Sequence, residues 1–225
     1  MVLVLGIDDA GKGPLIGPMI LAGVLAKKEK EGFFIQKGIK DSKLLVHSAR
    51  LKLVKIIKEH CLNSAFVKVY PEEIDDSPNL NTLEAQKAAE LVNLLNSGKY
   101  KKEKIKVIVD CPSTNIKKWK DTFLKMVKNT ENLDVYCEHK ADFNHPIVSA
   151  ASILAKVTRE DEVAKLKKEF QSYGDIGSGY PADPVTQQFL KKNGKILSNS
   201  GIFRKSWQTW KDLFPGKEQK TLSEF

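Results

Sequence analysis

The 225-residue sequence has few cysteines and no long uninterrupted hydrophobic run. Its three cysteines form no CxxC pair, which argues against a disulfide-stabilised scaffold and a cysteine-rich zinc module and favours free thiols in a reducing cytoplasm. The longest apolar stretch, residues 14–26, is broken by Gly17, Pro18 and Gly23 and falls short of the roughly 20 residues of a membrane helix. The first residues also lack the basic start and cleavage site of a signal peptide. We therefore expect a cytoplasmic protein that does not bind membranes.

Acidic residues are also in deficit: 28 Asp and Glu face 37 Lys and Arg, which leaves a formal net charge of +9. Such a surplus of positive charge favours a polyanionic partner such as nucleic acid. No Walker-type phosphate loop and no Ser/His/Asp constellation is visible in the sequence. With 41% hydrophobic residues the chain can form one or two domains with a real core.

The first 140 residues alternate between strand-like and helix-like segments. Runs of β-prone residues occur at 2–8, 19–26, 65–70, 105–109 and 133–137, and residues with helical spacing separate most of them. This order predicts an α/β layer with a partly parallel sheet. From residue 147 onwards the pattern is helical, and small residues at 149–155 would let the first helix pack closely on a sheet.

Two helix starts have candidate capping residues. Ser42 is positioned to cap a helix whose apolar stripe begins at Val46. Asn81, with Glu84 three residues later, resembles a capping arrangement for a second helix.

Carboxylates stand at the ends of predicted strands. Asp8 and Asp9 close the first strand, Asp110 ends the strand at 105–109, and Asp142 follows the fifth strand. Because ligands gather at strand ends in open α/β sheets, these acids could share a site. The pair at residues 75–76 lies instead in a Ser-Pro-Asn context, which predicts a solvated turn.

Acids that converge in this way repel one another unless a cation compensates their charge. Oxygen ligands with room for water suit Mg²⁺ or Mn²⁺ better than zinc. Two such ions can bind the attacking water and the leaving oxygen of a phosphodiester. From spacing alone, the alternative that Asp8, Asp110 and Asp142 are unrelated caps and turn residues stays open.

Six motifs, in order, resemble those of type 2 ribonuclease H (ribonuclease HII). They are Gly6-Ile7-Asp8-Asp9-Ala10-Gly11-Lys12-Gly13-Pro14, Lys40-Asp41-Ser42-Lys43, Val109-Asp110, Glu138-His139-Lys140-Ala141-Asp142, Ala150-Ala151-Ser152-Ile153-Leu154-Ala155-Lys156 and Gly177-Ser178-Gly179-Tyr180-Pro181. The resemblance implies a ribonuclease H-like α/β fold with a five-stranded mixed sheet flanked by helices and a helical C-terminal extension. We expect the catalytic domain at residues 1–172, the extension at 173–214 and a tail with a clamp-binding motif at 215–225.

The resemblance implies a metal-dependent endoribonuclease that hydrolyses the RNA strand of RNA–DNA hybrids. It also implies cleavage 5′ to a ribonucleotide embedded in duplex DNA, leaving 3′-hydroxyl and 5′-phosphate ends. The family's metal-binding catalytic acids correspond to Asp8, Asp9, Asp110 and Asp142, with Mg²⁺ or Mn²⁺ as cofactor. Its substrate-binding residues correspond to Gly11, Lys12 and Gly13 of the glycine turn, to Ser42 and Lys43 near substrate phosphates, and to Tyr180 beside the ribonucleotide.

Two positions depart from the family pattern. Asp9 stands where the family has Glu, and Lys12 stands where it has Arg, so the site loses a methylene and a bidentate donor. Adjacent strand residues face opposite sides, so Asp8 and Asp9 can serve one site only if the strand bends.

The last seven residues resemble the short motif that binds the sliding clamp (PCNA). Gln219, Leu222 and Phe225 have the required spacing, and one helical turn would place the two apolar side chains on one face. The expected partners are therefore RNA–DNA hybrid, ribonucleotide-containing duplex DNA and the clamp, with the protein itself a monomer.

Two other functions compete with this interpretation. One is another two-metal nuclease of the same superfamily, such as a junction resolvase, which would cut duplexes made only of DNA. The other is a non-catalytic, clamp-tethered module that binds hybrids, which the departure at Asp9 makes conceivable.

Overall fold

The computed structural model describes residues 2–39 and 45–215. Within them five strands form one sheet in the order β3-β2-β1-β4-β5, which confirms the expected five-stranded mixed sheet. β2 runs antiparallel to β1, whereas β4 runs parallel to both β1 and β5. The strands are β1 (Leu3–Ala10), β2 (Met19–Lys27), β3 (Asn63–Val69), β4 (Ile105–Asp110) and β5 (Leu133–Glu138).

Helices connect and flank the strands. They are α1 (Lys30–Gln36), α2 (His47–His60), α3 (Pro71–Asp76), α4 (Leu80–Leu95), α5 (Ile116–Met126), α6 (Ala141–Asn144), α7 (Pro146–Glu169), α8 (Pro184–Asn193) and α9 (Gln208–Leu213), with short 3₁₀ turns at Gly98–Lys102 and Gln171–Tyr173. In the described part of the chain, no helix combines the length and apolar character needed to cross a membrane.

The chain divides into two compact units, which are described separately. The first comprises residues 1–10, 20–68 and 79–159, and the second comprises residues 11–19, 69–78 and 160–225. The expected boundary at residue 172 therefore lies inside the second unit, which also takes up two segments from the N-terminal half of the sequence. Leu15 and Ile16 explain this grouping, because they pack in one hydrophobic cluster with Phe170, Ile176 and Phe203.

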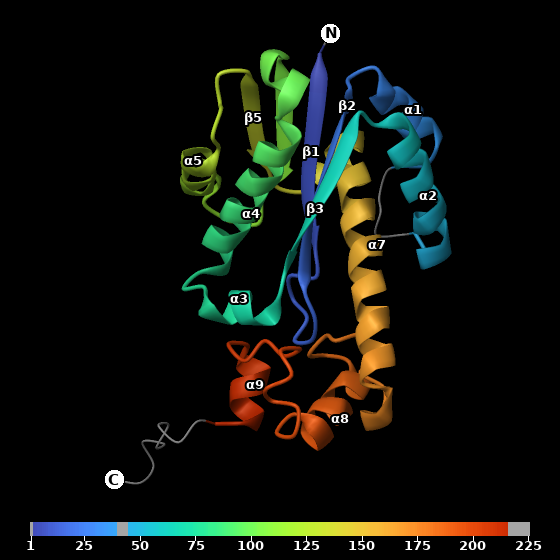
Figure 1. The fold of residues 1–225 in the computed structure, drawn as a ribbon, viewed down its shortest axis with the longest axis vertical. Helices are drawn as coiled ribbons and strands as arrows, with labels where there is room; N and C mark the ends of the chain where they lie inside the picture. Colours follow the sequence, from blue (N-terminus) through green and yellow to red (C-terminus); the bar gives the residue numbers. More distant parts are fainter. Residues whose placement is uncertain (1, 40–44, 216–225) are drawn as a thin grey trace. The chain divides into compact units, whose positions relative to one another are not determined.

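The sheet of the first unit is covered on both faces, as the uninterrupted burial of β1 and β2 requires. α4 and α5 lie on one side, and α1, α2 and the N-terminal part of α7 lie on the other (Figure 1). Side chains of α1, α2 and α7 share a buried cluster with Val4, Ile20 and Ile108 of the strands. On the opposite face, a side chain at Gly23 would collide with Leu95 of α4.

The two capping predictions are not confirmed. α4 begins two residues earlier than expected, because the Asn79 side chain accepts hydrogen bonds from the backbone N–H groups of Asn81 and Thr82. The prediction of Asn81 as the cap was therefore wrong. α2 begins at His47 with Val46 as its N-cap residue, whereas Ser42 lies outside the described residues.

Candidate active site

Two neighbouring strands bring Asp8 and Asp110 to the same edge of the sheet. β1 and β4 are parallel and pair Ile7 with Val109, so the next residue of each strand is an aspartate. Side chains alternate along a strand, which places Asp8 on the face of Gly6, and Asp110 on the face of Ile108. Gly6 and Ile108 both lie on the face of the sheet that α7 covers, so Asp8 and Asp110 share that face.

Gly6 lets the backbone of α7 approach β1 closely. A Cβ atom at Gly6 would lie 2.6 Å from the backbone nitrogen of Val148 and would also collide with the carbonyl group of Ile147. Small residues on α7, among them Ala150 and Ala151, are buried at this contact, as their size predicts. As a result Ser152, which lies further along the same helix, forms a side-chain hydrogen bond with Asp8.

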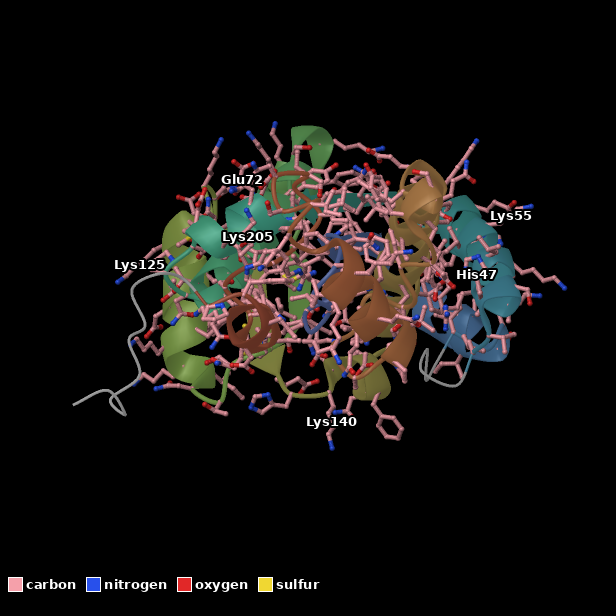
Figure 2. The ribbon with its side chains drawn as sticks, turned by 90° about the horizontal axis from the view of Figure 1, so that it is seen from below. His47, Lys55, Glu72, Lys125, Lys140 and Lys205 are labelled. Carbon is pink, nitrogen blue, oxygen red and sulfur yellow. The ribbon has the colours of Figure 1, made fainter. Side chains whose placement is uncertain are left out.

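The turn after β5 supports Asp110 and brings in the third acid. Lys140 takes a left-handed conformation with φ of 57°, and its side chain extends away from the ribbon in Figure 2. This turn starts α6, whose first residue, Ala141, donates its backbone N–H to Asp110 Oδ1 over 3.1 Å. Asp142, the next residue, is buried, with 6% of its surface exposed.

Asp9 is placed differently from Asp8. The β1–β2 ladder pairs Asp8 with Ala22, Asp9 with Leu21 and Ala10 with Ile20 without skipping a residue. The bend that would turn Asp8 and Asp9 onto one face is therefore not found in this ladder, and Asp9 follows the alternation of Leu5 and Ile7 towards the α4 side. The two residues still interact, because the backbone N–H of Asp9 donates to Asp8 Oδ1 over 2.7 Å.

The environment of Asp8 disfavours its charged form. Burial raises the pKa of the Asp8 carboxyl well above its ordinary value, and the negative charges of Asp9 and Asp110 raise it further. Hydrogen bonds from Ser152 and from the N–H of Asp9 oppose this rise without cancelling it. A positive charge at this place would favour the ionised carboxylate, because it would offset both burial and repulsion.

The oxygen donors of this edge fit a hard divalent cation in charge and chemistry. Asp8 is buried among like charges, and Asp110 and Asp142 follow on neighbouring elements. All four acids belong to the described residues. Within these residues, no three His, Cys, Asp or Glu side chains lie close enough together to hold a metal ion in the present conformation. The shared ligand shell of Asp8, Asp9, Asp110 and Asp142 therefore stays a prediction.

The predicted glycine turn, residues 11–13, follows β1 directly and belongs to the second unit. Gly11 has φ of 85°, a left-handed conformation that favours glycine. The fully buried Arg204 donates to the carbonyl oxygens of Gly11 and Lys12, each over 2.7 Å, and twice to that of Gly17, over 3.0 and 3.2 Å. Trp207 donates its indole N–H to the carbonyl oxygen of Gly13 over 3.1 Å.

Tyr180 lies beside this turn in the same unit. The residue is 43% exposed, and its Cε1 atom is 3.7 Å from the position of a Cβ atom at Gly13. The carbonyl oxygen of Gly179 accepts the backbone N–H groups of Leu15 and Ile16 over 2.8 and 3.2 Å. The structure thus brings Tyr180 and the glycine turn together, and their shared role in substrate binding stays a prediction.

The tyrosine loop is fixed from within by Asp183 and Thr186. The Asp183 carboxylate accepts from the backbone N–H and the hydroxyl of Ser178 over 2.6 and 2.7 Å. These bonds lower the pKa of Asp183 to about 2. The Thr186 hydroxyl donates to Ile176 O over 2.8 Å and accepts from the N–H of Gly179 over 2.9 Å. A side chain at Gly177 would collide with Asp183 and Thr186, so glycine is required there.

Sequence reasoning missed two residues of these sites. Ser152 belongs to one of the six motifs but was given no role, and Arg204 belongs to none of the motifs and was not considered. One signal could have found Arg204: only three of the 37 basic residues are arginines, so an arginine in this chain marks a place that needs a planar fork of donors.

The interpretation of the Asp75–Asp76 pair as a solvated turn was wrong. The two residues end α3, and the Asp75 carboxylate accepts from the backbone N–H groups of Lys205 and Ser206 and from the Ser206 hydroxyl over 2.6–2.9 Å. Asp75 thereby ties α3 to the segment that follows Arg204 within the second unit. The predicted phosphate contacts Ser42 and Lys43 and the clamp residues Gln219, Leu222 and Phe225 lie outside the described residues.

The five-stranded mixed sheet with aspartates at the ends of β1 and β4 is typical of the ribonuclease H-like nucleases. The solved ribonuclease H2 from Pyrococcus horikoshii OT3 superimposes with a TM-score of 0.80 at 35% identity and is similar over 94% of this chain and 96% of its own. The ribonuclease HII in a complex with PCNA from Archaeoglobus fulgidus gives a TM-score of 0.77, again at 35% identity, over 99% and 100% of the two chains.

Sequence comparison narrows the class to one family. The ribonuclease HII family model matches residues 5–210. Ribonuclease HII from Methanococcus maripaludis strain C6 is 39% identical over 99% of this chain and 92% of its own length, and that from Pyrococcus furiosus is 36% identical over 98% and 96%. The chain belongs to the ribonuclease HII family. It is an endoribonuclease of the ribonuclease H type, acts on RNA–DNA hybrids, and shares the family's dependence on divalent cations.

Proposed function

We propose that this ribonuclease cleaves 5′ to single ribonucleotides embedded in duplex DNA, as well as within the RNA strand of hybrids, and leaves 3′-hydroxyl and 5′-phosphate ends. The observation that carries the proposal is the meeting of Asp8 and Asp110 on one face of the sheet, where their charges interact. Membership of the ribonuclease HII family supports the substrate class. Removal of embedded ribonucleotides and of RNA primers are the corresponding roles.

Asp8, Asp9, Asp110 and Asp142 would hold two divalent cations, Mg²⁺ or Mn²⁺, in this enzyme. When bound, such ions activate a water and stabilise the charge that develops on the phosphate. The chain's own residues orient the ligands: Ser152 holds Asp8 by a hydrogen bond, and the N–H of Ala141 holds Asp110. Asp9 is the weakest member of this set, because it follows the opposite face of β1.

Recognition of the ribonucleotide would fall to the second unit. In the glycine turn, Gly11, Lys12 and Gly13, the two glycines have no side chain, so the backbone there can approach a ribose closely. The 2′-hydroxyl is the group that distinguishes RNA from DNA at such a site. Tyr180 offers an exposed ring beside the turn, and Ser42 and Lys43 would contact phosphates.

The C-terminal residues Gln219, Leu222 and Phe225 would bind the sliding clamp. The solved complex of PCNA with ribonuclease HII from Archaeoglobus fulgidus supports this assignment. Deletion of residues 219–225 should leave cleavage of short duplexes intact and abolish clamp binding in a pull-down. Clamp binding that survives the deletion would disprove the role of the tail. We place the enzyme, as a monomer, in the cytoplasm, where the three free cysteines would stay reduced.

A single assay tests the proposed activity. A duplex DNA with one ribonucleotide is incubated with Mg²⁺, Mn²⁺ or EDTA, beside the same duplex made only of DNA. Cleavage on the 5′ side of the ribonucleotide that requires the metal supports the proposal. Cleavage of the DNA duplex would identify a resolvase-like nuclease, and binding without any cleavage would identify a non-catalytic module.

Matched variants connect the activity to the acids. Asp8→Asn and Asp110→Asn should abolish cleavage and keep hybrid binding, since asparagine preserves the shape of the side chain and the lysines remain. Asp76→Asn, which removes an exposed acid of α3, should cleave like the wild type. Full activity of both site variants would refute the metal-binding role.

A further inference from the structure

The carbonyl groups of the glycine turn all face one side, where Arg204 and Trp207 bind them. Arg204 binds those of Gly11 and Lys12, together with the carbonyl group of Gly17, which lies after the turn, and Trp207 binds that of Gly13. Arg204 has no exposed surface, so its guanidinium group is fixed by these bonds and by the buried residues around it. Its guanidinium carbon also lies 5.1 Å from the centre of the Trp207 ring.

This arrangement fixes the direction of the N–H groups in the same peptide units. In a planar trans peptide the N–H of a residue points opposite to the carbonyl of the residue before it, and no described peptide bond is cis. The N–H groups of Lys12 and Gly13 are therefore directed away from Arg204. The other two bound carbonyls precede Pro14 and Pro18, which have no N–H. Two donors, and only these two among the four bound peptide units, are turned to the opposite side.

The charge of Arg204 also strengthens those two donors. A hydrogen bond from a guanidinium group to a carbonyl oxygen draws electron density from the peptide unit, and such bonds polarise one another in a buried setting. The N–H groups of Lys12 and Gly13 thereby become better donors to an oxygen acceptor. A lysine at position 204 would keep the charge but could not reach three carbonyl groups with a planar fork.

We infer that Arg204 and Trp207 are positioning residues for ribonucleotide recognition. Arg204 orients the N–H groups of Lys12 and Gly13 towards the sugar 2′-hydroxyl of the substrate, and Trp207 holds the end of the same turn at the Gly13 carbonyl. The inference rests on the proposed recognition of an embedded ribonucleotide by the glycine turn and adds the residues that make the turn selective. Neither residue touches the substrate in this account.

The test measures selectivity in binding, which does not need the metal-loaded enzyme. Dissociation constants are determined in EDTA for a duplex with one ribonucleotide and for the same duplex made only of DNA. Selectivity is the dissociation constant for the DNA duplex divided by that for the ribonucleotide duplex. This ratio should fall about five-fold in Trp207→Phe, which removes one hydrogen bond of ordinary strength. It should fall at least ten-fold in Arg204→Lys, whereas the affinity for the DNA duplex should stay as in the wild type.

Trp210→Phe is the matched control, because Trp210 lies in α9, the helix that begins directly after its N-cap residue Trp207. Trp210 is buried and packs on Phe203 and Phe214. General loosening of the unit would change both affinities together and would appear in this variant too. In the wild type, the ¹⁵N–H resonances of Lys12 and Gly13 should shift more with the ribonucleotide duplex than with the DNA duplex. Trp207→Phe keeps the test available if Arg204→Lys does not fold.

The outcomes separate this inference from the proposed function. A wild type that binds both duplexes equally would refute ribonucleotide recognition by the glycine turn, and the inference with it. A wild type that prefers the ribonucleotide, with the same ratio in Trp207→Phe and in every folded Arg204 variant, would overturn the inference alone. A fall of equal size in Trp210→Phe would also overturn it.

Discussion

Replacing Gly6 with alanine should displace α7 from β1 and disturb the site at Asp8. The new Cβ would lie 2.6 Å from Val148 N, so the helix backbone must move by roughly 1 Å to restore ordinary contact. Overpacking of this kind costs about 1–3 kcal/mol in free energy of unfolding. For a chain of this length we expect the melting temperature to fall by roughly 2–12 °C in scanning calorimetry.

The same displacement should reduce activity beyond the loss of stability. Ser152 lies on the helix that must move, so its hydrogen bond to Asp8 would lengthen or break. Misplacement by about 1 Å can cost a hundred-fold in rate, so kcat should fall well below the wild-type value at a temperature where both proteins are folded. The assay is cleavage of the duplex with one ribonucleotide.

Gly32→Ala is the control, because its expected effect on stability is opposite to that of Gly6→Ala. Gly32 lies in α1, and no atom lies within 4 Å of the position its Cβ would take. Alanine there should stabilise the protein by about 0.5–1 kcal/mol and leave cleavage unchanged. If Gly6→Ala melts at or above the wild-type temperature, the close contact between α7 and β1 is refuted.

Three further predictions concern titrating groups. Because the folded pKa of Asp8 is raised, its contribution to stability is present below the unfolded value of 3.8 and is lost as pH rises through the folded pKa. Asp8→Asn should therefore melt at a higher temperature than the wild type at pH 7 in EDTA. An equal or lower melting temperature would contradict the repulsion at Asp8. Carboxyl NMR should give Asp183 a pKa of about 2, so its contribution to stability is present above pH 3.8 and is lost as pH falls through 2. Ser178→Ala removes the hydroxyl donor and should move this pKa towards 3.8; no movement would exclude the bond from the Ser178 hydroxyl. Burial raises the pKa of the Cys137 thiol to about 12, so roughly one thiol in ten thousand is ionised at pH 8. Iodoacetamide should therefore label Cys137 only after unfolding. Rapid labelling of Cys137 in the folded protein would count against its burial.

The sheet and the place of its acids follow from local sequence. β1, β2 and β4 are short, mostly apolar runs. The run at 105–109 ends directly at Asp110, so the position of this acid could be predicted without tertiary information. The same reasoning located Asp8, because β1 ends two residues beyond it. These elements were predictable because burial on both faces of a sheet leaves a continuous apolar signal.

The supports of the site depend on contacts between distant parts of the chain. Arg204 binds carbonyl groups nearly 200 positions earlier, and nothing near residue 204 in the sequence indicates that partner. Asp75 looked like a turn residue because its partners, Lys205 and Ser206, are 130 positions away. The helix cap at Asn79 was missed for a local reason, since two asparagines two residues apart offer equivalent capping chemistry.

The functional groups of the two units affect the free energy of unfolding in opposite directions. This difference can be used to distinguish residues that bind a ligand from residues that support the site. In the first unit Asp8 is held where its charge is unfavourable, which is expected of a group that awaits a cation and destabilises the fold without it. In the second unit Arg204 satisfies four hydrogen bonds inside the protein, so its replacement leaves buried carbonyl groups without donors. Loss of the Asp8 charge should therefore stabilise the metal-free protein, whereas loss of Arg204 should destabilise it. Opposite signs in one melting experiment would assign Asp8 to the chemistry and Arg204 to the support of the glycine turn.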